Sequence, residues 1–106
     1  MKLNESMLVD LYELTMARGF FEAGKASEQA FFYHSFRNYP FKGGYAIASG
    51  MAHLAQVIED FQFSTEDIDY LAGLKSAKGE ALFDSKFLDY LAGLKLSLDV
   101  QSVREG

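Results

Sequence analysis

Hydrophobic residues crowd one stretch near the start of the chain, VDLYELTMARGFFEAG at residues 9–24. Successive residues of an α-helix are ~100° apart around its axis. At that spacing two flanks of the helix are apolar, one formed by Leu8, Val9, Tyr12, Met16 and Phe20 and the other by Leu11, Leu14 and Phe21. A helix that is apolar nearly all round is normally buried on several sides, so we expect this one to be covered from more than one direction.

This first helix is expected to run from about Ser6 to Gly19 or somewhat further. Asn4 and Ser6 are both residue types that cap a helix start, and Gly24 suits a helix end.

Two segments have the composition of strands. Residues 29–37, QAFFYHSFR, are aromatic on both faces, which favours a strand covered on both sides. Residues 96–101 alternate Leu96, Leu98 and Val100 with polar residues, as a half-buried strand does. Because two strands are marginal as an independent sheet, partner strands are expected from another molecule or from later sequence of a longer protein.

Three further helices are expected. The clearest is amphipathic, with Ile47, Met51, Leu54, Ile58 and Phe61 at helical spacing. A short helix follows Ser64 and Asp67, which stand at capping-box spacing, and another begins at Asp84 or Ser85. The sequence DYLAGLK occurs at both 69–75 and 89–95, but two copies with unrelated flanks indicate two similar helices rather than a solenoid.

Composition narrows the class of protein. A chain of 106 residues is expected to form one domain, and 49% hydrophobic residues are too many for a disordered segment. The net charge of −5, without a basic cluster, argues against binding to nucleic acid or to an anionic membrane. There is no cysteine, and the first residues resemble neither a signal peptide nor a membrane span. We therefore expect a cytoplasmic protein.

Few residues offer chemistry by themselves. His34 and His53 lack the spacing of metal ligands or of a catalytic triad, so we assign no catalytic residue and no metal site. The Gly43-Gly44 pair reads first as a turn, and Arg37 as a surface salt bridge, although either could meet a phosphate. Tyr12 could stack on a planar ligand, but core packing is the better interpretation from the residues alone.

Several longer motifs resemble the N-terminal region of nicotinate phosphoribosyltransferases. They are LVDLYELTMARGFFEAGKA, FFYHSFRNYPFKGGYAIASGM, FQFSTEDIDYLAGL and FDSKFLDYLAGLKLSLDVQSVREG, and their family equivalents come in the same order. The resemblance spans nearly all of the chain. It departs from the family at Val9, where Thr is common, at Ser35, where a Phe is usual, and at SVREG, which replaces a Pro-Glu-Gly ending.

The resemblance implies an α+β fold, the helix-plus-antiparallel-sheet N-terminal domain of a type II phosphoribosyltransferase. Residues 1–106 would be an incomplete segment of that domain, and the catalytic β/α barrel domain is absent. The chain alone is expected to be inactive. Whether 106 residues is the natural length is left open.

The reaction implied by the resemblance belongs to NAD salvage biosynthesis. Nicotinate and phosphoribosyl pyrophosphate give nicotinate mononucleotide, with ATP hydrolysis coupled through a phosphorylated histidine and with Mg²⁺ balancing the phosphates. That histidine belongs to the barrel, so neither His34 nor His53 takes its role, and this segment is expected to bind neither ATP nor Mg²⁺ itself. A related enzyme that acts on nicotinamide or quinolinate is an open alternative.

The resemblance also assigns two binding residues. Tyr12 matches a tyrosine that contacts the nicotinate ring, and Asp10 matches an acidic residue near the same pocket. The active site would be shared between the subunits of a homodimer, so that one flank of the first helix packs on its own domain and another meets the partner's barrel. The alternative function is a non-catalytic interaction or dimerisation module that keeps the family's N-terminal fold.

Overall fold

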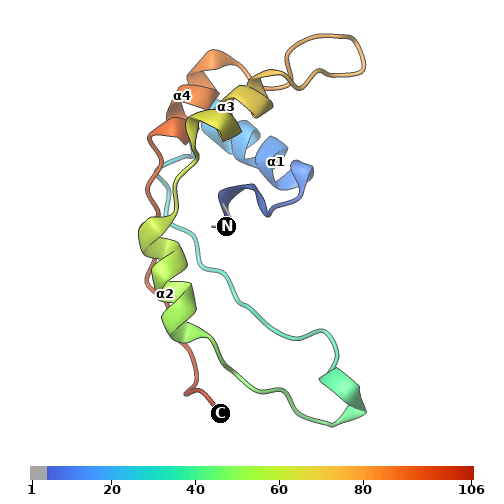
Figure 1. Ribbon diagram of the computed structural model, residues 1–106, viewed down its shortest axis with the longest axis vertical. Helices are drawn as coiled ribbons and strands as arrows, with labels where there is room; N and C mark the ends of the chain where they lie inside the picture. Colours follow the sequence, from blue (N-terminus) through green and yellow to red (C-terminus); the bar gives the residue numbers. More distant parts are fainter. Residues whose placement is uncertain (1–4) are drawn as a thin grey trace.

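The computed structural model describes residues 5–106 as a helical chain. Its elements are α1 (Leu11–Glu22), α2 (Met51–Asp60), α3 (Thr65–Ala72) and α4 (Ser85–Ala92), with 3₁₀ turns η1 (Glu5–Met7) and η2 (Pro40–Lys42). In Figure 1, α1, α3 and α4 gather at one end of the molecule and α2 lies apart from them. The radius of gyration is 16.8 Å, against about 13 Å for a compact domain of this length. Much of the chain therefore lies outside the helical cluster.

The hydrophobic core lies between α1, α3 and α4. Phe87 and Phe83 are almost completely buried, and their rings lie 5.6 Å apart. The other buried apolar residues are Leu14, Phe63, Leu71, Leu88 and Leu91.

The repeated sequence DYLAGLK forms the ends of α3 and α4, and the leucine at its third position is buried in both copies. Leu71 and Leu91, at equivalent positions, are both buried, with 1% and 2% of their surface exposed. The two tyrosines differ. Tyr90 lies 4.9 Å from the ring of Phe21, whereas Tyr70 is 62% exposed. The two helices are thus similar in sequence but have different neighbours.

The capping signals of α3 and α4 are confirmed. Ser64 N–H donates to Asp67 Oδ2 at 2.8 Å and Asp67 N–H donates to Ser64 Oγ at 3.1 Å, which is a capping box at the start of α3. Asp84 Oδ1 accepts from the backbone N–H of Phe87 at 2.9 Å, so Asp84, and not Ser85, caps α4. Both caps join residues three positions apart.

Gly24 ends α1, as its sequence position indicates. Its φ of +75° is one that glycine adopts at little cost. Gly24 N–H donates to Phe21 O at 3.1 Å and Lys25 N–H donates to Phe20 O at 2.8 Å, the pair of bonds that defines a Schellman motif.

The expected start of α1 is wrong. The helix begins at Leu11 with Asp10 as its N-cap residue, not at Ser6. Ser6 is instead buried in η1 and donates to Asp67 Oδ2 at 3.1 Å, so a tertiary contact uses the hydroxyl that sequence reasoning assigned to a cap. Asn4, the other proposed cap, lies outside the described residues.

The expected antiparallel sheet is also wrong. Residues 29–37 and 96–101 run in extended form but pair with no strand, and the bridge found in residues 5–106 is an isolated one between Lys75 and Ala81. Hydrophobic alternation shows which side chains suit a pleated surface, but a strand exists only where another backbone pairs with its N–H and C=O groups. The described chain provides no such partner to either segment, so its fold is helical rather than α+β.

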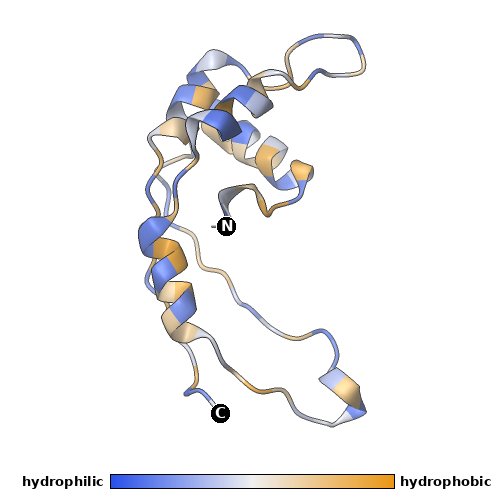
Figure 2. Cartoon of the chain, in the orientation of Figure 1, coloured by the Kyte–Doolittle hydropathy of each residue, from blue (hydrophilic) through white to orange (hydrophobic). Residues whose placement is uncertain are grey.

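The aromatic segment is not covered on both faces. Phe31 is 92% exposed and Tyr33 is 98% exposed. They belong to what we call the aromatic arm, residues 25–50, which runs from the end of α1 away from the helical cluster, turns at η2 and leads into the start of α2 (Figure 1). Figure 2 shows hydrophobic residues distributed along this arm and along α2, outside the cluster.

Candidate functional site

One flank of α1 is fixed to the helical cluster. Leu14 is buried there, and the ring of Phe21 lies 5.7 Å from that of Phe87 and 4.9 Å from that of Tyr90. Aromatic pairs at such distances stabilise a packing beyond the area that they bury. This flank sets the orientation of the whole helix.

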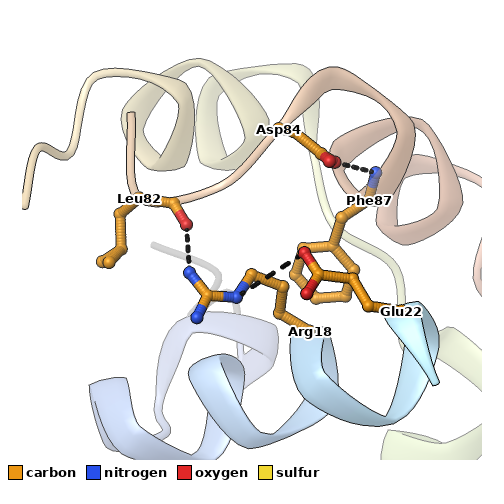
Figure 3. A network of polar contacts seen from close by, with 5 residues as sticks. All are labelled: Arg18, Glu22, Leu82, Asp84 and Phe87. Atoms are coloured by element: carbon orange, nitrogen blue, oxygen red, sulfur yellow. Dashed lines mark hydrogen bonds and ion pairs between the residues drawn. The ribbon is translucent and has the colours of Figure 1, made fainter. Parts of the chain in front are cut away.

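Arg18 provides a polar anchor on the same side (Figure 3). Its Nη1 donates to the backbone carbonyl of Leu82 at 2.6 Å, and its Nε lies 3.9 Å from Glu22 Oε1. The Nε atom is buried and makes no hydrogen bond, so the ion pair with Glu22 is what faces it. Arg18 thereby ties α1 to the segment that leads into α4.

Tyr12 and Asp10, the two residues assigned by resemblance, lie at the start of α1. Tyr12 is 60% exposed, so its ring is not in the core, contrary to the interpretation from the residues alone. Asp10 is also exposed, and its backbone N–H donates to Glu13 Oε2 at 3.3 Å. Residues two apart do not face each other on a helix, so the structure does not bring the two side chains into one closed pocket.

The outer flank of α1 is an apolar stripe. It consists of the exposed residues Tyr12, Met16 and Phe20 of α1 together with Leu8 and Val9, which come just before the helix, and Leu11, the first residue of the helix, is exposed as well. The expectation of a helix buried on several sides is therefore wrong within residues 5–106, where α1 buries one flank. A shallow cavity of about 370 Å³ lies beside the stripe, and its lining residues are Met7, Leu8, Val9, Asp10 and Glu13. Asp10 thus faces a concavity.

Arg37 and the Gly43-Gly44 pair lie on the aromatic arm. Arg37 is exposed and forms no ion pair with another described residue, so the expected surface salt bridge is not found there. Phe41 and Lys42, just before the glycines, have φ values of +57° and +56° in the η2 turn. Figure 1 shows this turn far along the molecule from α1, so the arm does not bring Arg37 toward Tyr12.

A larger cavity, of about 850 Å³, lies between η1, α2 and α3. His53 Nε2 lies 3.5 Å from Glu5 Oε1 at its rim, and Gln56 Nε2 donates to Asp60 Oδ2 at 2.8 Å. Phe61, Phe63 and Ile68 are among its apolar lining residues. Sequence reasoning placed His53 on a polar helix face but had no signal for Glu5 as its partner, because the two residues are far apart along the chain.

Within residues 5–106 no group of three or more His, Cys, Asp or Glu side chains is placed to hold a metal ion. In the same part of the chain, no helix is both long enough and apolar enough to cross a membrane.

A family model described as the nicotinate phosphoribosyltransferase (NAPRTase) N-terminal domain matches residues 7–106. The chain belongs to this family. The resemblance drawn from its motifs is confirmed. The match begins just before the apolar stripe and includes both Asp10 and Tyr12.

Curated relatives agree with the family match. The chain is 39% identical over 66 residues to a nicotinate phosphoribosyltransferase of Bos taurus, covering 62% of this chain and 12% of the relative. It is 32% identical over 81 residues to that of Caenorhabditis elegans, with 76% and 14% covered, and 37% identical over 68 residues to that of Homo sapiens, with 64% and 13% covered. The chain thus spans a small part of each relative's length. No solved structure matches it.

Proposed function

We propose that this chain is the N-terminal part of an enzyme that converts nicotinate and phosphoribosyl pyrophosphate to nicotinate mononucleotide, with ATP hydrolysis, in NAD salvage. The observation that supports this most is the family match over residues 7–106. In the reaction the ring nitrogen of nicotinate forms a bond to the anomeric carbon of the sugar, and the bond from that carbon to pyrophosphate breaks. Most of the catalytic groups are proposed to lie in the remainder of the enzyme.

The contribution proposed for this chain is a ring contact from Tyr12. Its side chain is exposed on the outer flank of α1, while Leu14, Arg18 and Phe21 hold the inner flank. A tyrosine held on an anchored helix offers a planar apolar face and a hydroxyl to an aromatic ligand. Asp10, beside the shallow cavity, is proposed to lie at the edge of the nicotinate pocket that the remainder of the enzyme would complete around Tyr12.

ATP and Mg²⁺ are proposed as requirements of the whole enzyme, where Mg²⁺ would neutralise phosphate charge. The described residues do not fit a metal ion, since they contain no cluster of carboxylates or histidines placed to hold one. We therefore assign no step of metal chemistry to this chain.

A homodimer with a shared active site is the proposed assembly, and the cytoplasm the proposed compartment. The apolar stripe of α1 supports the assembly, because it presents several large hydrophobic side chains that this chain leaves exposed. A partner subunit that covered the stripe would also bring its own groups next to Tyr12.

A non-catalytic interaction module is the second candidate function. The same stripe favours it, because it offers several exposed hydrophobic side chains for a partner to cover. The two candidates predict different sequences after Gly106 in the natural reading frame. Continuation into a barrel with a histidine for phosphorylation supports the enzyme, and a stop codon with no partner chain encoded nearby supports the module.

Activity of the isolated chain provides a separate test. We expect no nicotinate mononucleotide from the 106-residue chain with nicotinate, phosphoribosyl pyrophosphate, ATP and Mg²⁺. Product formation above the background of a heat-inactivated sample would contradict the proposal that most catalytic groups lie in the remainder of the enzyme.

The role of Tyr12 is tested by substitution in the longest natural form of the protein. Tyr12→Ala should raise the KM for nicotinate by roughly three- to tenfold, the range that an aromatic contact supports, and Tyr12→Phe should keep most of the affinity. Tyr70→Ala is the matched control, since Tyr70 is equally exposed on α3. Equal effects of Tyr12→Ala and Tyr70→Ala would exclude a specific ring contact.

A further inference from the structure

Helix α2 begins without a cap of its own. Gly50, the N-cap residue, has a φ of +91° and no side chain, and the first turn, MAHL, contains no Ser, Thr, Asp or Asn. The first N–H groups of any helix have no partner within the helix and are usually satisfied by such a residue. Gly50 O accepts from Leu54 N–H at 2.9 Å, but no neighbouring side chain accepts from the first N–H groups of α2.

A residue far along the chain provides the missing acceptor. Met51 N–H donates to Glu105 Oε1 at 2.6 Å, across 54 residues of sequence. Next to it, Gly106 N–H donates to Ala48 O at 3.0 Å. A carboxylate at a helix N-terminus is favourable twice over, because it accepts from an otherwise unpaired N–H and because it meets the positive end of the helix dipole.

Residues 95–106, which we call the C-terminal strap, are held at both of their ends. At the other end, Lys95 Nζ donates to Gln62 Oε1 at 3.0 Å, just beyond the last turn of α2. Figure 1 shows the strap running beside α2 between these two points. The strap thus follows the helix from its C-terminal to its N-terminal end.

We propose that the strap is a clamp in which Glu105 caps α2 from a distance and, with the bond from Gly106 to Ala48, fixes the backbone where the aromatic arm meets α2. The two hydrogen bonds fall on Ala48 and Met51, on either side of Gly50. Gly50 is the last residue of the arm and has a left-handed backbone conformation. Because glycine has no side chain, Gly50 cannot itself accept a hydrogen bond from the first turn of α2 through a side chain. Release of Glu105 would free the arm and the first turn of α2 together.

Glu105 is a positioning residue in this scheme. It acts on the arm through the backbone of residues 48–51 and touches no substrate in the described structure. The clamp does not depend on the proposed enzyme function, because it consists of contacts within this chain alone.

Amide hydrogen exchange of the 106-residue chain tests the clamp. In Glu105→Gln the side chain keeps its shape but is neutral, so its hydrogen bond with Met51 N–H is weaker. In Glu105→Ala that hydrogen bond is lost. We expect exchange at Met51 to rise about fivefold in the alanine variant, the factor that a typical N-cap contributes, and by less in the glutamine variant. Exchange at Phe87 in α4, which Asp84 caps, should not change.

Asp99→Asn is the matched control. It removes one negative charge from the same strap, and Asp99 is exposed with no hydrogen bond to α2 among the described residues. If Asp99→Asn raises exchange at Met51 as much as Glu105→Gln does, the effect is one of net charge and the clamp is wrong. Unchanged exchange in Glu105→Ala would overturn it as well.

A cross-link keeps the proposal testable if the Glu105 variants fold poorly. The chain has no cysteine, so a pair introduced by Ala48→Cys and Gly106→Cys can react only with each other within one molecule. We expect rapid disulfide formation in dilute oxidising buffer for this pair. The control pair, Phe31→Cys with Gly106→Cys, uses an exposed residue elsewhere on the arm, and the strain of a side chain at Gly106, whose φ is +110°, is common to both pairs. Equal rates for the two pairs would show that the strap does not hold residues 48–51.

Discussion

The hydroxyl of Ser6 donates a hydrogen bond of 3.1 Å to Asp67, 61 residues further along the chain. The same carboxylate oxygen accepts from the backbone N–H of Ser64 at 2.8 Å, in the capping box of α3. The Asp67 side chain therefore takes part in the N-terminal cap of α3 and also binds the η1 turn to that helix. Only 1% of the surface of Ser6 is exposed, so water replaces this bond poorly.

Ser6→Ala should lower the free energy of unfolding by about 1–2 kcal/mol, because it removes a buried bond to a charged acceptor. Urea unfolding followed by circular dichroism measures the change. Ser102→Ala is the control, since Ser102 is exposed and bonds to the neighbouring Val103 carbonyl at 3.0 Å. A loss of stability in the control as large as in Ser6→Ala would show that the hydrogen bond to Asp67 contributes no more to the free energy of unfolding than an exposed hydrogen bond does.

Arg18 and Glu22 should differ in their importance although they are partners. Arg18→Met removes the 2.6 Å bond to Leu82 O and should destabilise the chain by about 1–2 kcal/mol. Glu22→Gln weakens only a 3.9 Å ion pair with a half-exposed carboxylate and should change stability by less than about 0.5 kcal/mol. Thermal unfolding of both variants tests this order, and an equal loss would mean that the ion pair matters as much as the carbonyl contact.

Two glycines at α1 should respond to alanine in opposite directions. Gly19 lies inside the helix with nothing within 4 Å of an added Cβ, so Gly19→Ala should stabilise by roughly 0.5–1 kcal/mol. Gly24 has a φ of +75°, so Gly24→Ala should destabilise by roughly 1–2 kcal/mol although its Cβ would also meet open space. Helical content and urea midpoints measure both. Shifts of the same sign would contradict the C-terminal geometry of α1.

Sequence reasoning succeeded where the relevant partner lies within a few residues. Ser64 with Asp67, Asp84 before α4 and Gly24 after α1 were all recognised, because capping depends on side chains and backbone three to five positions apart. The family was recognised as well, since its motifs are continuous stretches of sequence and need no tertiary contact to be recognised. The start of α1 was missed because both Ser6 and Asp10 suit a cap, and the choice depends on Asp67, a residue of another helix.

Sequence patterns did not determine which apolar segments are covered, or by which neighbours. The aromatic pattern of residues 29–37 led to a strand buried on both faces, but pairing requires a second backbone, and the described chain places none there. The repeat DYLAGLK likewise gives no reason why Tyr90 meets Phe21 while Tyr70 faces solvent.

Helix α2 shows the same division between local and distant causes. The amphipathic pattern of Met51, Leu54 and Ile58 was enough to predict a helix, but it did not show that Ile47, which has the same spacing, lies before the helix start. The helix begins at Met51, where Glu105 from the C-terminal strap accepts its first N–H. Periodicity and capping residues act over one or two turns and can be read along the chain, whereas contacts across 54 or 61 residues arise only when the folded backbone brings distant segments together.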